Sequence, residues 1–117
     1  MELTIPDDLP TAGVDIPVVE ACAGIKGLGA LTLAQNRLSP GFLLFEDHLE
    51  YKVFFRRRVR YSDIEEVKGV SQRYFNRMRF IFRSRALTLT IFLFSMREYS
   101  VLADFLRRKG IAVQTKN

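Results

Sequence analysis

The chain has 117 residues, 48% of them hydrophobic, and a net charge of +5, which suits one compact domain rather than two. Its single cysteine, Cys22, and single histidine, His48, exclude an internal disulfide and a His/Cys metal site, so we expect no redox or zinc chemistry. No apolar run approaches the ~20 residues of a membrane-spanning helix.

Residues 1–25 are predicted to form an acidic, partly flexible N-terminal arm, and residues 26–117 to form the folded domain. The arm contains five acids and no bases, and three of the four prolines lie in its first 17 residues. It lacks the basic start and apolar run of a secretory signal, so a cytoplasmic location is expected. Near the end of the arm, spacing predicts a helical turn over residues 18–23.

Alternation of apolar and polar residues, as in LEYKVFF, predicts a series of short antiparallel strands. Asp47 and His48 supply the turn chemistry of the first hairpin. The last strand becomes apolar on both faces, which is typical of a central strand covered by a helix or arm. The seven predicted strands span residues 28–34, 41–46, 49–54, 57–61, 64–71, 76–84 and 86–94.

A helix is predicted over residues 96–109. Ser95 and Glu98 have the spacing of a capping box, and Gly110 suits the residue after the helix end. Val101, Leu102, Phe105 and Leu106 form an apolar stripe, so this helix is expected to close one end of the sheets.

Catalytic motifs are absent from the sequence, and we expect neither enzyme activity, a cofactor nor a small-molecule substrate. Glu65 and Glu66 are adjacent on a strand and face opposite sides, so they cannot act as an acid/base pair. His48 is interpreted as an exposed turn residue, and Cys22 as a small core residue.

Arginines are the strongest indication of a binding function. The residues after the arm contain 18 bases against 8 acids, a net charge of +10, which favours an anionic partner. Guanidinium groups match phosphate oxygens in a bidentate manner, and the neighbouring phenylalanines could insert at a headgroup interface. The candidate contact residues are Phe54, Phe55, Arg56, Arg57, Arg58, Arg60, Arg77, Arg79, Arg83 and Arg85.

Two alternatives stay open for these residues. Phe55 could continue the core stripe while the arginines only protect an edge strand or keep the protein soluble. The acidic arm could instead lie over the arginines and compete with an external partner. Nucleic acid is disfavoured as the partner, because Phe80 falls on the apolar face and leaves too few exposed aromatic rings for stacking.

The order of seven strands and one C-terminal helix resembles the pleckstrin-homology-like (PH-like) fold. The stretch FLLFEDHLEYKVFFRRRVRYSDIEEV is similar to small bacterial PH-like domains, with Ser62, Asp63 and Ile64 in a characteristic turn. The resemblance covers about residues 26–112. It implies a mainly β fold, in which two antiparallel sheets form a seven-stranded barrel or sandwich capped by one C-terminal α-helix.

The resemblance also implies binding of lipids, peptides or proteins without catalysis. We therefore expect a binding or adaptor module that engages a protein partner or assembles with copies of itself. The alternative is peripheral binding to anionic lipids at the inner face of the membrane through the arginine-rich hairpins.

Overall fold

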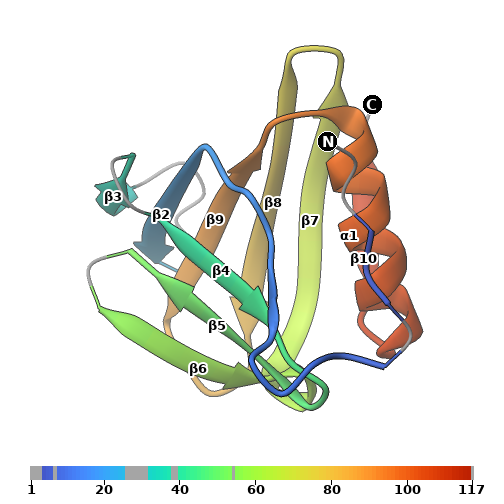
Figure 1. Ribbon diagram of the computed structural model, residues 1–117. Coiled ribbons are helices and arrows are strands. Elements are labelled where there is room, and N and C mark those ends of the chain that lie inside the picture. The colour runs from blue at the N-terminus through green and yellow to red at the C-terminus, as the bar shows by residue number, and fades with distance from the viewer. Residues whose placement is uncertain (1–3, 7, 26–31, 38–39, 54, 117) are drawn as a thin grey trace.

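Two β-sheets face each other in the computed structural model, which describes residues 4–6, 8–25, 32–37, 40–53 and 55–116, with the backbone alone for 32–36 (Figure 1). The smaller sheet is antiparallel, with the spatial order β1-β4-β5-β6. Its strands are β1 (Val14–Asp15), β4 (Gly41–Leu44), β5 (His48–Lys52) and β6 (Arg56–Arg60).

The larger sheet has the spatial order β10-β7-β8-β9-β2-β3. Its neighbours are antiparallel except β10, which runs parallel to β7. Its strands are β2 (Glu20–Ile25), β3 (Thr32–Asn36), β7 (Ile64–Gln72), β8 (Phe75–Phe82), β9 (Leu87–Leu93) and β10 (Val113–Lys116). A 3-10 turn, η1 (Tyr61–Asp63), joins β6 to β7, and the helix α1 (Met96–Arg108) follows β9.

The predicted fold class is confirmed: the protein is mainly β, with two sheets and one C-terminal helix. Six of the predicted strands correspond to β4 to β9 within a few residues, and the seventh corresponds to β3, although residues 28–31 lie outside the described part. Strands β1, β2 and β10 were not predicted.

The helical turn predicted over residues 18–23 is wrong, because Glu20–Ile25 form β2 between β9 and β3. The boundary at residue 25 is also wrong, since it would remove a strand from the interior of the larger sheet. Ile16, within the predicted arm, is 1% exposed and belongs to the core. The physical reason is that backbone pairing with β9 and β3 outweighs the local helical spacing, and this pairing places Ala21 in the core, fully buried.

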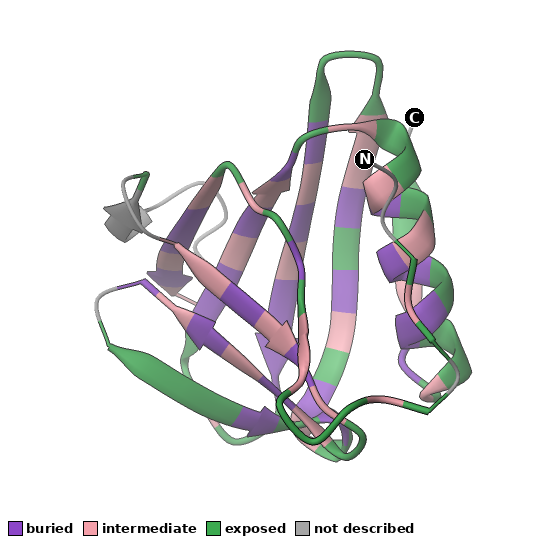
Figure 2. Cartoon of the chain, viewed as in Figure 1, coloured by how far each residue is buried: buried purple, intermediate pink, exposed green. Residues whose placement is uncertain are grey.

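One hydrophobic core lies between the two sheets and the helix (Figure 2). Each strand contributes alternate residues to it, as period-2 geometry requires. Phe42 of the smaller sheet contacts Phe80 of the larger sheet with ring centroids 5.6 Å apart, and Tyr51 stacks on Phe82 at 6.2 Å. These cross-sheet ring pairs fix how the two sheets face each other.

Helix α1 begins at the predicted cap and closes one side of the core. The Ser95 hydroxyl oxygen accepts a hydrogen bond from the Glu98 N–H at 3.3 Å, and the hydroxyl donates to the Glu98 carboxylate at 2.6 Å. Leu102, Phe105 and Leu106 are buried, as predicted. The helix ends at Arg108, and Gly110 has a φ of 84°, a conformation that favours glycine.

Tyr99 anchors the helix on the larger sheet. Its hydroxyl lies 2.8 Å from the Thr115 hydroxyl oxygen, and its ring lies over Gly69 of β7. A Cβ atom at Gly69 would come within 2.7 Å of the ring carbon Cζ and closer still to the hydroxyl oxygen. Glycine is therefore the residue that lets α1 approach β7 and β10.

We predict that Gly69→Ala lowers the free energy of unfolding by about 1–3 kcal/mol, because the methyl group forces Tyr99 out of its position. Chemical denaturation monitored by circular dichroism measures the change. Gly41→Ala is the matched control, since the nearest atom to its added Cβ is the Lys52 Cβ at 3.4 Å. Equal losses for the two variants would contradict the role given to Gly69.

Candidate binding surfaces

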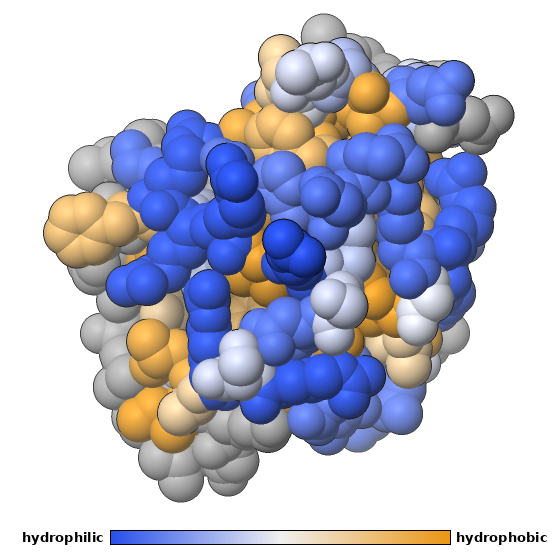
Figure 3. Space-filling view, turned by 90° about the horizontal axis from the view of Figure 1, so that it is seen from below, coloured by the Kyte–Doolittle hydropathy of each residue, from blue (hydrophilic) through white to orange (hydrophobic). Residues whose placement is uncertain are grey.

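Four exposed arginines lie along β6, an edge strand of the smaller sheet. We call Arg56, Arg57, Arg58 and Arg60 the arginine strip. Val59, between them, is 2% exposed and points into the core. Phe55, just before β6, is 76% exposed and is not part of the core, whereas Phe54 lies outside the described residues. Figure 3 shows that hydrophilic side chains cover much of the lower face of the molecule, with hydrophobic ones among them.

Part of the charge of the arginine strip is neutralised within the protein. The Glu50 carboxylate, on the neighbouring β5, lies 3.6 Å from Nη1 of Arg56 and 3.6 Å from Nη2 of Arg58. Antiparallel pairing brings these three residues together, because Glu50 is directly opposite Arg58. An external anion at this point has to compete with Glu50.

His48 lies in β5 and is largely buried, so its interpretation as an exposed turn residue is wrong. Its ring stacks on Phe45 with centroids 4.5 Å apart. Its Nδ1 lies 2.6 Å from the Asp47 carboxylate, and this hydrogen bond lowers the pKa of Asp47. His48 Nε2 is 3.6 Å from Glu50, so the ring links two acids beside the arginine strip.

Arg83 and Arg85, from the turn between β8 and β9, lie next to the arginine strip. Arg85 donates hydrogen bonds to the backbone oxygen of Arg58 at 3.3 Å and to the Tyr51 hydroxyl at 3.4 Å. Arg83 donates to the backbone oxygen of Ser62 at 3.3 Å. The structure thus brings six of the predicted arginines together, and Arg85 also ties the β8–β9 turn to the smaller sheet.

Arg77 and Arg79 lie elsewhere, on the outer face of the larger sheet. Arg79 donates to the backbone oxygen of Ile25 at 3.3 Å. Arg77 lies over the Phe75 ring, with its guanidinium carbon 5.5 Å from the centroid. The ten predicted contact residues therefore do not form one site.

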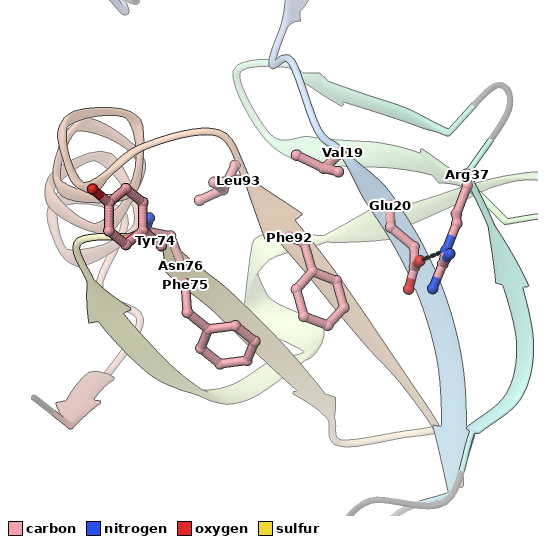
Figure 4. Close-up of a pocket in the computed structure, with 8 residues that line it drawn as sticks. All are labelled: Val19, Glu20, Arg37, Tyr74, Phe75, Asn76, Phe92 and Leu93. Carbon is pink, nitrogen blue, oxygen red and sulfur yellow. Dashed lines mark hydrogen bonds and ion pairs between the residues drawn. The ribbon is translucent and has the colours of Figure 1, made fainter.

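A second surface surrounds a pocket of about 500 Å³ at one end of the larger sheet (Figure 4). It opens where β2 begins, β9 ends and β8 begins. The lining residues are Val19, Glu20, Arg37, Tyr74, Phe75, Asn76, Phe92 and Leu93. We call Val19, Tyr74, Phe75 and Phe92 the aromatic surface.

Backbone pairing holds the aromatic surface in place. Phe92 lies opposite Arg77 on β8 and Glu20 on β2, and the Val19 N–H donates to the Phe92 backbone oxygen at 2.7 Å. The Phe75 and Phe92 rings pack edge to face, with centroids 5.8 Å apart. Tyr74, at the tip of the hairpin, is 86% exposed, with the Arg73 guanidinium 5.2 Å from its ring centroid.

The polar side of the pocket is an ion pair between Glu20 and Arg37. Burial alone would raise the pKa of Glu20, but the hydrogen bond from the Cys22 thiol at 3.1 Å and the Arg37 guanidinium together lower it. Glu20 is therefore a carboxylate whose charge is balanced inside the pocket.

The aromatic surface was not among the predicted binding residues. The apolar outer positions of the last strand were read as covered by a helix or arm, whereas α1 contacts the inner side of the sheet. The signal that could have indicated it is the sequence Tyr74-Phe75, two aromatic residues at a hairpin tip. Side chains at a hairpin tip lie beyond the hydrophobic core and therefore stay exposed.

Potential metal ligands do not converge in the described part of the chain. No set of three or more His, Cys, Asp or Glu residues there could hold a metal ion. Burial, followed by the hydrogen bond to Glu20, raises the pKa of Cys22 to about 12. The thiol is thus held in its protonated, weakly nucleophilic form.

None of the described helices is long and apolar enough to cross a membrane. Comparison with known proteins adds no assignment, because neither a protein family nor a curated protein matches the sequence.

We predict that Cys22 reacts with a thiol reagent such as Ellman's reagent at least about a hundredfold more slowly in the folded protein than in the chain unfolded in urea, because only the thiolate reacts. The released chromophore at pH 8 measures both rates. Fast reaction of the folded protein, at a rate near that of the unfolded chain, would show that the thiol is accessible and ionised.

Proposed function

We propose that this protein is a non-catalytic, cytoplasmic binding module of the PH-like type that engages another protein, or a second copy of itself, through the aromatic surface. The observation that carries this proposal is the clustering of exposed apolar side chains. Among the described residues, five of the seven exposed large hydrophobic side chains lie at this end of the larger sheet: Val19, Tyr74, Phe75, Phe94 and Met96.

Exposed apolar groups that gather in one place are characteristic of protein interfaces, whereas isolated ones are common on any surface. Aromatic residues are enriched in such interfaces because they bury a large area with few rotatable bonds. Phe94 is 62% exposed and directly follows Leu93 of the pocket. The aromatic surface therefore continues beyond the pocket toward the start of α1.

The order of elements supports the PH-like type. Strands β3 to β9 followed by α1 give seven strands and a closing helix, divided between two sheets. Strands β1, β2 and β10 extend this plan at the sheet edges and beside β9. A protein of this type binds through its surface.

We predict that the protein self-associates in a concentration-dependent manner and that the double variant Tyr74→Ser, Phe75→Ser is monomeric. Both side chains are exposed, so the variant should keep the thermal stability of the wild type within a few degrees. Size-exclusion chromatography with light scattering measures the mass. If wild type and variant are both monomeric at millimolar concentration, self-assembly is excluded and the proposed partner is a different protein.

Peripheral binding to anionic membranes is the second candidate function, favoured by the geometry of the arginine strip. Four exposed guanidinium groups follow an exposed Phe55 along one edge strand. Cations next to an apolar side chain suit the headgroup region of a bilayer. The pairing of Glu50 with Arg56 and Arg58 lowers the net positive charge of this edge, which argues for weak, salt-dependent binding.

We predict that binding to phosphatidylserine vesicles is lost in the triple variant Arg56→Ser, Arg58→Ser, Arg60→Ser. Wild-type binding should fall steeply between roughly 50 and 300 mM salt, because the Debye length shortens as the salt concentration rises. Vesicle sedimentation measures the bound fraction. The control changes three exposed cations elsewhere, Lys68, Arg97 and Lys116, to Ser. Equal binding by the two triple variants would remove the arginine strip as the contact site.

A further inference from the structure

We infer that the pocket beside the aromatic surface binds an acidic and apolar segment of a partner protein, in which a carboxylate lies next to an apolar side chain. This inference rests on the proposed function, because it names the partner chemistry of the same surface. Three features carry it: the apolar floor of the pocket, an arginine beside that floor whose Nε–H has no hydrogen-bond partner among the described residues, and the internal balance of the acid that lines the pocket.

The apolar floor selects the hydrophobic part of the ligand. Phe75 and Phe92 meet edge to face, so a ring or branched side chain of the ligand can pack on both. The backbone of Phe92 is already held in the sheet between β8 and β2, so binding costs little conformational entropy there. A pocket of about 500 Å³ has the size of a small-ligand or side-chain site, and a flat bilayer does not enter it.

Arg77 lies beside the pocket, next to two of its lining residues, and selects the charged part of the ligand. It lies opposite Phe92 on one side and Val70 on the other, and its guanidinium stacks near the Phe75 ring. Its Nε–H is shielded from solvent and has no hydrogen-bond partner among the described residues. A shielded donor without an acceptor is energetically unfavourable. A turn of the Arg77 side chain toward the pocket opening, where a ligand carboxylate binds the guanidinium in bidentate geometry, satisfies it.

The acid already in the pocket does not oppose a second carboxylate. Glu20 is paired with Arg37 and accepts a hydrogen bond from the Cys22 thiol. Arg73, stacked on Tyr74 at the hairpin tip, adds a further positive charge on the open side. The two charged residues in the pocket lining, Arg37 and Glu20, balance each other. The positive charge offered to an anionic segment comes from Arg73 and Arg77, which lie over the lining residues Tyr74 and Phe75.

The test uses the full chain labelled with ¹⁵N and two capped peptides, Asp-Leu-Phe-Asp and its uncharged match Asn-Leu-Phe-Asn. We expect amide shifts at Phe75, Arg77 and Phe92 with the acidic peptide, and roughly tenfold weaker binding of the uncharged one, as expected for loss of a charge-assisted hydrogen bond. Arg77→Gln should weaken binding of the acidic peptide by the same factor. Arg58→Gln, which removes one charge from the arginine strip, should leave it unchanged.

Equal affinity for the two peptides at the pocket would overturn the recognition of a carboxylate while leaving an apolar protein-binding surface. Absence of binding, or shifts confined to β6, would also overturn the inference. Phosphatidylserine vesicles form a third arm, in which binding that depends on both Phe75 and Arg77 would assign the pocket to lipid and overturn a protein segment as the ligand. Self-association is read separately, from the masses of the wild type and of the Tyr74→Ser, Phe75→Ser variant, so its failure is distinguishable from failure of carboxylate recognition.

Discussion

The register of β9 in the larger sheet is the constraint on which the rest of the structure depends. β9 is paired on both sides, with β8 and β2, and its inner residues Leu89, Ile91 and Leu93 are buried in the core. Because successive side chains of a strand point to opposite faces, this register sends Phe92 outward. A shift by one residue would bury Phe92 and expose the three aliphatic side chains. The core thus fixes the floor of the pocket, and a partner need not order it.

The edge of β6 has a different physical problem, since an edge strand presents unpaired backbone groups to solvent. The Tyr61 N–H donates to the Asp47 backbone oxygen, so the backbone groups of Tyr61 point toward β5. Backbone direction alternates along a strand, and Arg58, three residues earlier, therefore points its N–H and C=O away from β5, to the open edge. Arg85 donates to that outward oxygen. The charged side chains of β6 and the hydrogen bond from Arg85 both protect this edge from pairing with another strand. Edge protection therefore explains part of the arginine content of this region without an external ligand.

The helix and the strands from residue 41 to 94 could be predicted from the sequence because local signals agree there with the final packing. Ser95 and Glu98 form a cap from residues three apart, and the alternation in β8 places Met78 and Phe80 on one face. β2 could not be predicted in this way. Val19, Cys22 and Ile25 have helical spacing, whereas the decisive interactions are hydrogen bonds to β9, some 70 residues later. Non-local pairing of this kind leaves little trace in local pattern.

The same distinction applies to the surfaces. Exposure of Arg56, Arg58 and Arg60 follows from alternation, but the position of Glu50 opposite Arg58 and of Arg85 beside it depends on how strands are paired and sheets are joined.

The hypothesis that the acidic N-terminal segment covers the arginine strip is wrong for the described residues. β1 occupies the opposite edge of the smaller sheet from β6, and the Leu9 N–H lies 3.5 Å from the Glu46 carboxylate, beside the β4–β5 turn. Part of the charge of the strip is therefore balanced from within the sheet, by Glu50, whereas the Nε–H of Arg77 has no hydrogen-bond partner among the described residues. Counting arginines in the sequence therefore overstates the free charge on β6.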